Sequence, residues 1–188
     1  MTSEIIIAGF GGQGVLSMGK TLAYAGVLRG KEVTWLPSYG PEQRGGTSNV
    51  TVVISDERIS SPIVDSYDVV IALNQQSLSK FEKSVKPGGV LIYDSYGIQD
   101  VPTRQDINIY SVDATRTANA SGLQKMTGVM VLGAMLGLGG MMDKDAIMDS
   151  LKKTLPERYH NLLPANEKAL TMGESMAICQ NKAAATAA

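Results

Sequence analysis

The chain contains little of the chemistry on which independent metal and redox proteins depend. Its 188 residues include one cysteine, Cys179, and one histidine, His160. A disulfide framework needs paired cysteines, and an iron–sulfur cluster held by one chain needs about four thiolates. A single histidine likewise excludes a metal site built mainly from imidazole ligands. We therefore expect no metal site and no cluster on this chain alone.

An excess of one charge is also missing. The 17 Lys and Arg residues are balanced by 18 Asp and Glu residues, which gives a formal net charge of −1. Without a basic field we expect no nucleic-acid partner. The most apolar run, residues 129–138, is shorter than the ~18 residues that a membrane-spanning helix needs. With a first strand expected close to Met1 and no signal peptide before it, these features predict a cytoplasmic protein without a membrane partner.

What the chain does have is a regular alternation of strand and helix patterns. Apolar, β-branched runs such as 5–8, 68–73 and 90–94 alternate with helical segments, and the pattern is helical from Ala114 through 161–181. It predicts an α/β, Rossmann-like three-layer fold: a mostly parallel sheet with helices on both faces and a helical C-terminal part. We expect a single domain over 1–182, with the alanine-rich tail 183–188 disordered.

A glycine-rich turn follows the first predicted strand. Residues 5–14 read IIIAGFGGQG, and a helix is expected to continue to about Arg29. Backbone N–H groups and the positive end of the helix dipole face such a turn, where glycine lets an anion approach closely. The turn is predicted to bind a cofactor, with tight packing of the helix on its strand as the alternative role. Its candidate residues are Gly9, Gly11, Gly12, Gln13 and Gly14.

The turn also matches the dinucleotide fingerprint G-x-G-x-x-G. A dinucleotide site needs in addition an Asp or Glu at the end of the second strand, to bind a ribose hydroxyl. Here the second predicted strand, 32–36, has its acidic residue, Glu32, at its start and therefore at the wrong end of the sheet. A free-standing NAD(P)-binding Rossmann enzyme is therefore the less favoured alternative.

Residues 14–21 (GVLSMGKT) match the P-loop pattern as well. A P-loop begins directly after its strand, whereas residues 9–13 intervene here. Val15 and Leu16 already keep the apolar register of the helix, and this register places Lys20 about two turns along, facing solvent. The match therefore does not predict ATP hydrolysis.

A second loop, residues 37–46 (PSYGPEQRGG), follows the second predicted strand. It offers an aromatic ring, a carboxylate, an amide and a guanidinium group on a backbone constrained by proline and glycine. Loops at the carboxyl ends of parallel strands share one rim, so we expect this loop beside the glycine turn, with Arg44 able to bind a carboxylate or phosphate. The predicted binding residues are Tyr39, Gly40, Glu42, Gln43, Arg44 and Gly45.

Together these motifs resemble a known family. GFGGQG (9–14), YGPEQRGG (39–46) and TSNVTVVIS (47–55) look like the gamma subunit of the 2-oxoacid:ferredoxin oxidoreductases, of the 2-oxoglutarate or branched-chain type. In fused versions, such as pyruvate:ferredoxin oxidoreductase, the same unit is a domain of a longer chain. The family often has an asparagine near the start of the late apolar helix. Residues 127–130 read TGVM here, so no role is carried over for it.

The resemblance implies a function for the chain within a complex. Enzymes of this family oxidatively decarboxylate a 2-oxoacid, form an acyl-CoA and reduce ferredoxin. Thiamine diphosphate and Mg²⁺ are implied to lie chiefly on alpha and beta subunits, and iron–sulfur clusters on beta and on a ferredoxin-like delta subunit. The gamma unit is implied to pack on alpha and to help form the CoA site. The isolated chain, holding no cofactor alone and supplying no catalytic residue, is expected to be inactive. A scaffold or regulatory subunit remains an alternative.

Overall fold

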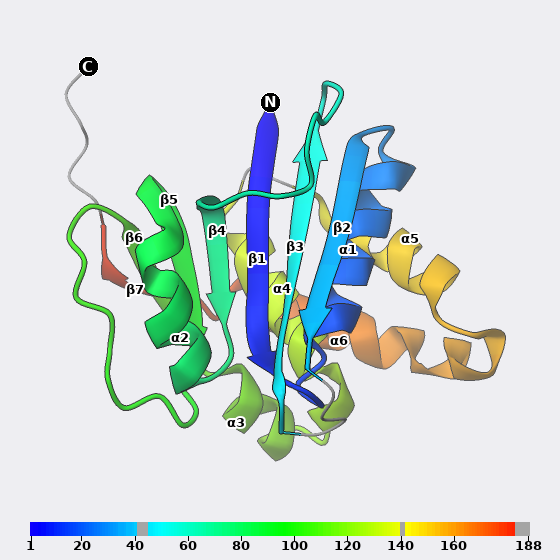
Figure 1. Ribbon diagram of the computed structural model, residues 1–188. Coiled ribbons are helices and arrows are strands. Elements are labelled where there is room, and N and C mark those ends of the chain that lie inside the picture. The colour runs from blue at the N-terminus through cyan, green and yellow to red at the C-terminus, as the bar shows by residue number, and fades with distance from the viewer. Residues whose placement is uncertain (41–44, 140–141, 183–188) are drawn as a thin grey trace.

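The computed structural model describes residues 1–40, 45–139 and 142–182, and the predicted tail 183–188 lies outside this part of the chain. A seven-stranded sheet of order β2-β3-β1-β4-β5-β6-β7 lies at its centre (Figure 1). The strands are β1 (Thr2–Phe10), β2 (Glu32–Tyr39), β3 (Thr47–Ser55), β4 (Tyr67–Ala72), β5 (Val85–Asp94), β6 (Asn108–Val112) and β7 (Ile178–Asn181).

Six α-helices accompany the sheet in the described residues. They are α1 (Val15–Leu28), α2 (Gln75–Phe81), α3 (Ala114–Ala120), α4 (Thr127–Gly137), α5 (Lys144–Thr154) and α6 (Leu163–Glu174). Three short 3-10 helices, η1 (Glu82–Ser84), η2 (Gln124–Met126) and η3 (Glu157–Leu162), lie between them. None of the described helices is both long and apolar enough to cross a lipid bilayer.

Strand β1 is central because its side chains are apolar on both faces. Ile5 and Ile7 face one hydrophobic core, and Ile6 faces the other. All three are at most 1% exposed, since successive side chains of a strand point to opposite faces of the sheet. The continuous apolar run therefore predicted a strand that is covered on both sides, as observed.

The sheet is mixed, with five of its seven strands running in one direction. β1, β4, β5 and β6 pair in parallel, whereas β3 pairs antiparallel with both β1 and β2, and β7 pairs antiparallel with β6. The prediction of a mostly parallel α/β sheet is confirmed. The main exception to parallel pairing is the β2–β3 hairpin. It lies on the side of β1 opposite to β4, with β3 next to β1 and β2 at the edge of the sheet.

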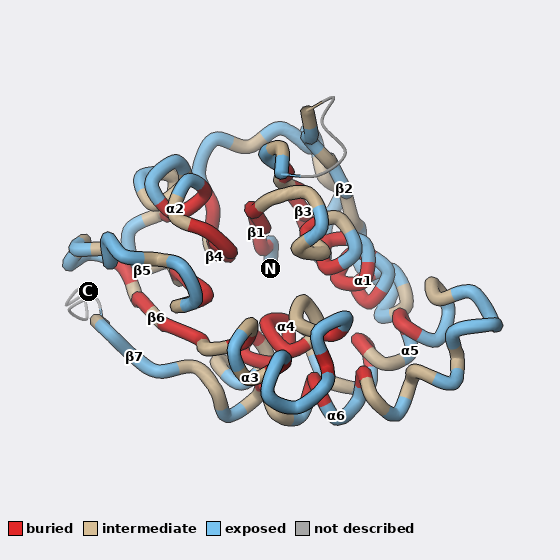
Figure 2. The backbone as a smooth tube through the Cα atoms, turned by 90° about the horizontal axis from the view of Figure 1, so that it is seen from below, coloured by how far each residue is buried: buried red, intermediate tan, exposed pale blue. Residues whose placement is uncertain are grey.

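Helices cover both faces of the sheet unequally. One core joins the sheet to α1, α4, α5 and α6, whereas the opposite core contains Leu78 of α2 with Phe81 packed against it. Seen along the sheet, α2 lies on one side and the larger helical layer lies on the other (Figure 2). The predicted three-layer arrangement and the helical C-terminal part are therefore present.

At each edge of the sheet, an element differs from the sequence predictions. The helix expected over 161–181 ends at Glu174, and β7 follows it, so that Cys179 lies exposed on a strand. β7 pairs with the edge of β6, a distant partner that the local pattern does not reveal. At the other edge, β2 continues through Pro37 to Tyr39 where a loop was predicted, because an edge strand tolerates a proline whose missing N–H faces outward.

Helices α4 and α6 touch through their backbones. A Cβ atom added to Gly133 would lie 2.1 Å from the carbonyl oxygen of Leu170, and one added to Gly173 would lie 2.0 Å from that of Met130. Neither backbone oxygen can move without displacing its helix. Glycine at these positions therefore sets the distance between the two helices.

We predict that Gly133→Ala lowers the free energy of unfolding by about 1–3 kcal/mol, because the added methyl group forces α4 and α6 apart. Urea unfolding followed by circular dichroism measures this loss. Gly128→Ala in the same helix is the matched control, since its Cβ would meet the flexible side chain of Met18 rather than a backbone atom. Equal stability of the two variants would contradict the prediction.

Candidate functional site

The glycine turn joins the end of β1 to the start of α1. Gly12 and Gly14 have φ values of +100° and +80°, which favour glycine. Gly14 caps α1 without a side-chain bond, and the first turn of the helix carries no acidic residue. The N–H of Met18 is bonded to Gly14 O at 2.9 Å. The N–H groups of residues 15–17 are left without helical partners, so the positive end of the helix dipole is available to an anion.

The side chain of Gln13 turns inward and bridges two turns of the fold. Its Oε1 accepts hydrogen bonds from the N–H of Phe10 at 2.6 Å and from Nδ2 of Asn74 at 3.1 Å. Its Nε2 donates to the carbonyl oxygen of Leu73 at 2.9 Å. The turn after β1 is thereby tied to the turn after β4. A direct ligand contact for Gln13 stays a prediction.

Asn74 completes this bridge from the other side. Its Oδ1 accepts a hydrogen bond from the N–H of Ser77 at 2.8 Å and so caps α2. Gly9 is also part of the packing, because a Cβ there would lie 2.8 Å from Gln13 Oε1. The tight-packing role predicted as the alternative is therefore real for Gly9 and Gln13. Among residues 1–40, 45–139 and 142–182, no hydrogen-bond partner is found for the N–H groups of residues 15–17 at the start of α1.

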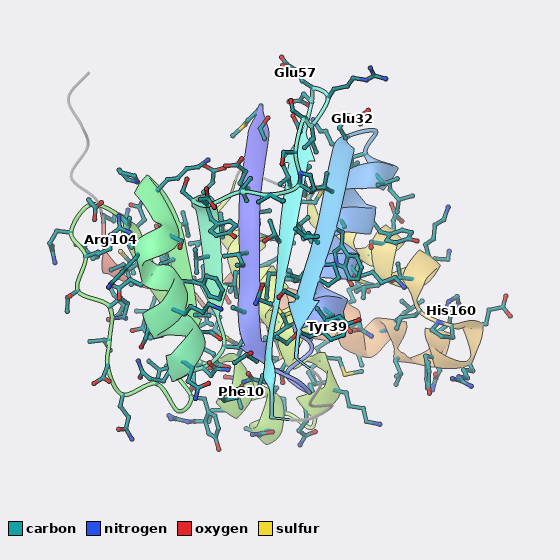
Figure 3. The ribbon with its side chains drawn as sticks, viewed as in Figure 1. Phe10, Glu32, Tyr39, Glu57, Arg104 and His160 are labelled. Atoms are coloured by element: carbon teal, nitrogen blue, oxygen red, sulfur yellow. The ribbon has the colours of Figure 1, made fainter. Side chains whose placement is uncertain are left out.

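The ends of the second loop lie beside the glycine turn, as expected. The N–H of Gly11 donates to Gly46 O at 2.9 Å, and Gly40 N donates to Thr47 O at 3.4 Å. Phe10 and Tyr39 lie toward the same end of the sheet, and the Tyr39 side chain is 68% exposed (Figure 3). The predicted residues Glu42, Gln43 and Arg44 lie outside the described residues, so their roles stay predictions.

A cavity of about 580 Å³ opens beside the glycine turn. Gly12, Gln13 and Gly14 line it, whereas Gly9, Gly11, Tyr39, Gly40 and Gly45 do not. The rest of its wall comes chiefly from α1, α4, α5 and the turn after β5. The rim of strand ends accounts for Asp94 and Tyr96 at the end of β5, which the sequence placed beside the glycine turn. Sequence reasoning did not place the other polar residues of the wall in a site: Ser17, Lys20, Thr21, Thr115, Asn119, Gln124, Lys125, Thr127, Thr154 and Asn166.

The two lysines give the cavity a cationic side. Lys20 is exposed on the second turn of α1, as the helical register predicted, and it also lines the cavity. Lys125 comes from η2 and is exposed as well. Nothing in the local pattern around Lys125 signals this position, because only the packing of α4 against α1 brings the two segments together.

Asp94 is the buried carboxylate of the cavity wall, at 2% exposure. Its Oδ1 accepts from Tyr96 N at 3.1 Å, and its Oδ2 accepts from the N–H of Thr115 at 3.1 Å and from the Thr115 hydroxyl. Burial raises the pKa of Asp94, and these hydrogen bonds offset part of that rise. Asp94 therefore acts as a cap, since it accepts hydrogen bonds from the first turn of α3.

The topology removes the basis for a dinucleotide site. The parallel neighbour of β1 is β4, so the carboxyl end that meets the glycine turn belongs to β4 and not to β2. Asn74 follows β4, and its amide is already bonded to Gln13 and Ser77. Glu32 lies toward the opposite end of the sheet from Phe10 (Figure 3). The P-loop match fails too, because Val15 already begins α1.

The sequence of residues 4–176 matches the family described as pyruvate ferredoxin/flavodoxin oxidoreductase. The chain belongs to this family. Ketoisovalerate oxidoreductase subunit VorA of Methanothermobacter marburgensis is 41% identical over 93% of this chain. The chain spans only 36% of that relative's length, about a third. The 2-oxoglutarate synthase subunit KorC of the same organism is 38% identical over 83% of this chain and 88% of its own length.

Solved structures agree with this membership. The gamma subunit of a keto/oxoacid ferredoxin oxidoreductase from Geobacter sulfurreducens superposes with a TM-score of 0.80 at 31% identity, covering 94% of this chain and 96% of the subunit. A 2-oxoglutarate:ferredoxin oxidoreductase from Magnetococcus marinus, solved with 2-oxoglutarate, coenzyme A and succinyl-CoA, has a TM-score of 0.83 at 23% identity. The match covers 97% of this chain and 33% of the Magnetococcus marinus chain. It shows that the two chains share a fold.

We predict that Gln13→Ala destabilises the protein by about 1–3 kcal/mol, because it leaves buried polar partners unpaired at two turns. Thermal or urea unfolding measures the loss. Gln76→Ala, an exposed glutamine on α2, is the control and should change stability little. If both variants unfold alike, the bridge between the two turns does not contribute as described.

We also predict that the Asp94 carboxyl titrates above its ordinary value of 3.8. Between that value and the raised pKa, the folded chain holds a proton that the unfolded chain has released, so the contribution of Asp94 to stability falls as pH rises. Carboxyl-carbon NMR follows the titration directly. Asp56 is the internal reference, because Lys31 and the N-terminus lower its pKa to about 2. An Asp94 midpoint at or below 3.8 would refute this assignment.

Proposed function

We propose that the chain is the gamma subunit of a multi-subunit, thiamine-diphosphate-dependent 2-oxoacid:ferredoxin oxidoreductase. Such an enzyme converts a 2-oxoacid, CoA and oxidised ferredoxin into an acyl-CoA, CO₂ and reduced ferredoxin. The observation that carries the proposal is the near end-to-end likeness to a subunit named gamma, which covers 94% of one chain and 96% of the other. We place the enzyme in the cytoplasm and favour 2-oxoglutarate or a branched-chain 2-oxoacid as substrate.

The proposed partners are the other subunits of such an enzyme. KorC, of which this chain covers 88%, is itself named as a subunit of 2-oxoglutarate synthase. We propose alpha, beta and a ferredoxin-like delta subunit as the partners of this chain, with ferredoxin as the electron acceptor.

The metal-dependent cofactors fit the partners and not this chain. No group of three or more His, Cys, Asp or Glu side chains in the described residues is arranged to hold a metal ion. Cys179 is a single exposed thiol on β7, and an iron–sulfur cluster needs several thiolates. We therefore assign thiamine diphosphate with its Mg²⁺, and the iron–sulfur clusters, to the other subunits.

Coenzyme A does fit residues of this chain. When bound, it supplies the thiol that accepts the acyl group. Its phosphates need an anion site, and the cavity offers the free N–H groups at the start of α1 together with Lys20 and Lys125. We propose that these groups, with Arg44 and its neighbours in the second loop, bind and orient the phosphates. A purely scaffolding subunit would need none of them.

Reconstitution tests the proposed function. The complex is assembled from this chain and its co-encoded partners, and viologen or ferredoxin reduction is followed with a 2-oxoacid and CoA. We expect CoA-dependent reduction only when this chain is present. Full activity without the chain would refute the proposal, and NADH formation by the chain alone would favour the nicotinamide enzyme instead.

We predict that Arg44→Ala, assembled into the complex, raises the KM for CoA by roughly 10-fold or more, the loss expected for a charge-assisted hydrogen bond. The value of kcat should change little, because the contact proposed for Arg44 is with a phosphate of CoA, away from the reacting thiol. Arg58→Ala is the matched control, since this exposed arginine follows Glu57 at the opposite end of the sheet (Figure 3). An unchanged KM with normal turnover would exclude the role of Arg44.

A further inference from the structure

Large apolar side chains lie exposed together on two neighbouring elements, α1 and β2. We call this group the β2 edge surface, and it consists of Tyr24, Val27, Trp35, Leu36 and Tyr39. No other helix or strand in the described part of the chain carries more than one exposed residue of this kind. Apolar residues that are exposed as a group mark interaction sites, whereas single ones are ordinary.

These side chains are neighbours because α1 packs along β2, the outermost strand on its side of the sheet (Figure 2). A Cβ added to Gly26 would lie 2.8 Å from the Val33 side chain, so α1 covers the face to which Val33 points. Trp35 and Tyr39 lie on that same face, because alternate side chains of a strand share a face. Leu36 lies on the opposite face. The surface therefore includes both sides of the sheet edge.

The edge is better suited to a folded protein than to an added strand. Pro37 lies in the middle of the surface and has no N–H, so a strand paired along β2 would lack a hydrogen bond there. Charged residues border the surface, with Lys20 beside Tyr24 and Glu32 at the start of β2. An aromatic centre with a charged border is typical of a protein–protein interface.

The β2 edge surface adjoins the rim of the candidate site. Lys20 lines the cavity, and its ammonium group lies 5.8 Å from the centroid of the Tyr24 ring. Tyr39 ends β2 next to the second loop, and Gly46 O at the end of that loop accepts a hydrogen bond from the N–H of Gly11 in the glycine turn. A partner that covers this rim therefore extends onto the β2 edge surface.

The proposed reaction requires one particular partner at this rim. Coenzyme A, whose phosphates we assign to the rim, accepts an acyl group that another subunit generates from the 2-oxoacid. Transfer takes place only when the thiol and the acyl group are held in contact. The subunit that binds the 2-oxoacid therefore has to lie against the rim, whereas a ferredoxin-like subunit needs no contact with coenzyme A.

We propose that the β2 edge surface docks the subunit that binds the 2-oxoacid, with Trp35 and Tyr24 as its central contacts. The inference rests on the proposed function, because the acyl transfer is what selects this partner. Tryptophan and tyrosine are the residues that most often dominate the affinity of an interface. Trp35 is 41% exposed in the chain alone and is buried in the docked complex.

Hydroxyl-radical footprinting with mass spectrometry tests this burial. The reactivities of Trp35 and Tyr24 are compared in the chain alone, in the assembled complex and in mixtures with each co-encoded subunit. We expect both residues to be protected in the complex and by the thiamine-binding subunit, whereas exposed Tyr159, outside the surface, keeps its reactivity. Unchanged reactivity of Trp35 in the assembled complex, or protection by the ferredoxin-like subunit instead, would overturn the proposal.

Substitutions test the same surface through affinity. Trp35→Ala should weaken binding to the thiamine-binding subunit by about 30-fold or more, the loss typical of a central interface residue. Val27→Asp, at a position 57% exposed on α1, should also weaken it, because docking would bury an unpaired carboxylate. Val101→Asp is the matched control, since Val101 is 59% exposed in the loop between β5 and β6. Circular dichroism melting checks the fold of each variant, and equal affinities of Val27→Asp and Val101→Asp would contradict the proposal.

The outcomes also distinguish the other occupant and the proposed function. Self-association of the chain in sedimentation experiments, abolished by Val27→Asp, would assign the surface to a second copy and overturn the proposed partner. If the complex oxidises a 2-oxoacid with CoA while Trp35 stays reactive, the docking surface is refuted and the proposed function stands. If Trp35 is protected but the complex oxidises no 2-oxoacid, the proposed function fails and the surface remains an interface with that subunit.

Discussion

Three hydrogen bonds of one amide, that of Gln13, hold the arrangement on which the candidate site depends. They join Phe10 at the end of β1 to Leu73 and Asn74 at the end of β4. With this bridge in place, the glycine turn is fixed against the neighbouring strand, and the start of α1 lies along the cavity. An amide supplies donor and acceptor together, so it satisfies both turns without introducing a charge that would compete with an anionic ligand.

The mixed sheet topology determines which two turns this bridge connects. In a doubly wound fold the second strand of the chain lies beside the first, but here the β2–β3 hairpin fills the other side of β1 and leaves β4 as its parallel neighbour. The residue opposite the glycine turn is consequently Asn74, a cap for α2, where a dinucleotide-binding protein would present a carboxylate. The same glycine pattern therefore lies beside a different strand and a different side chain than in a dinucleotide-binding protein.

The helical C-terminal part then builds the cavity. Gly133 and Gly173 allow the backbones of α4 and α6 to touch, and α4 with the segment before it faces α1. Tyr96 follows β5 on the same rim as the glycine turn, whereas Lys125 reaches the cavity from a segment that no local pattern connects with that turn. The cavity thus brings two lysines and an aromatic ring together, and the described residues contain no group of three or more His, Cys, Asp or Glu that could hold a metal ion.

Local patterns in the sequence determined much of this protein. The apolar run of β1, the alternation of strands and helices and the glycines around Gln13 specify the α/β fold, because burial and backbone conformation follow from short stretches of chain. The family resemblance rested on the glycine turn and on residues 39–55. Tertiary structure alone decided which strand meets the glycine turn, that residues 178–181 form β7 on a distant edge, and that Lys125 and Asn166 line the cavity with α1. These features depend on contacts between residues far apart in the chain. The hydrophobic periodicity of a short segment does not reveal which distant segment it will contact.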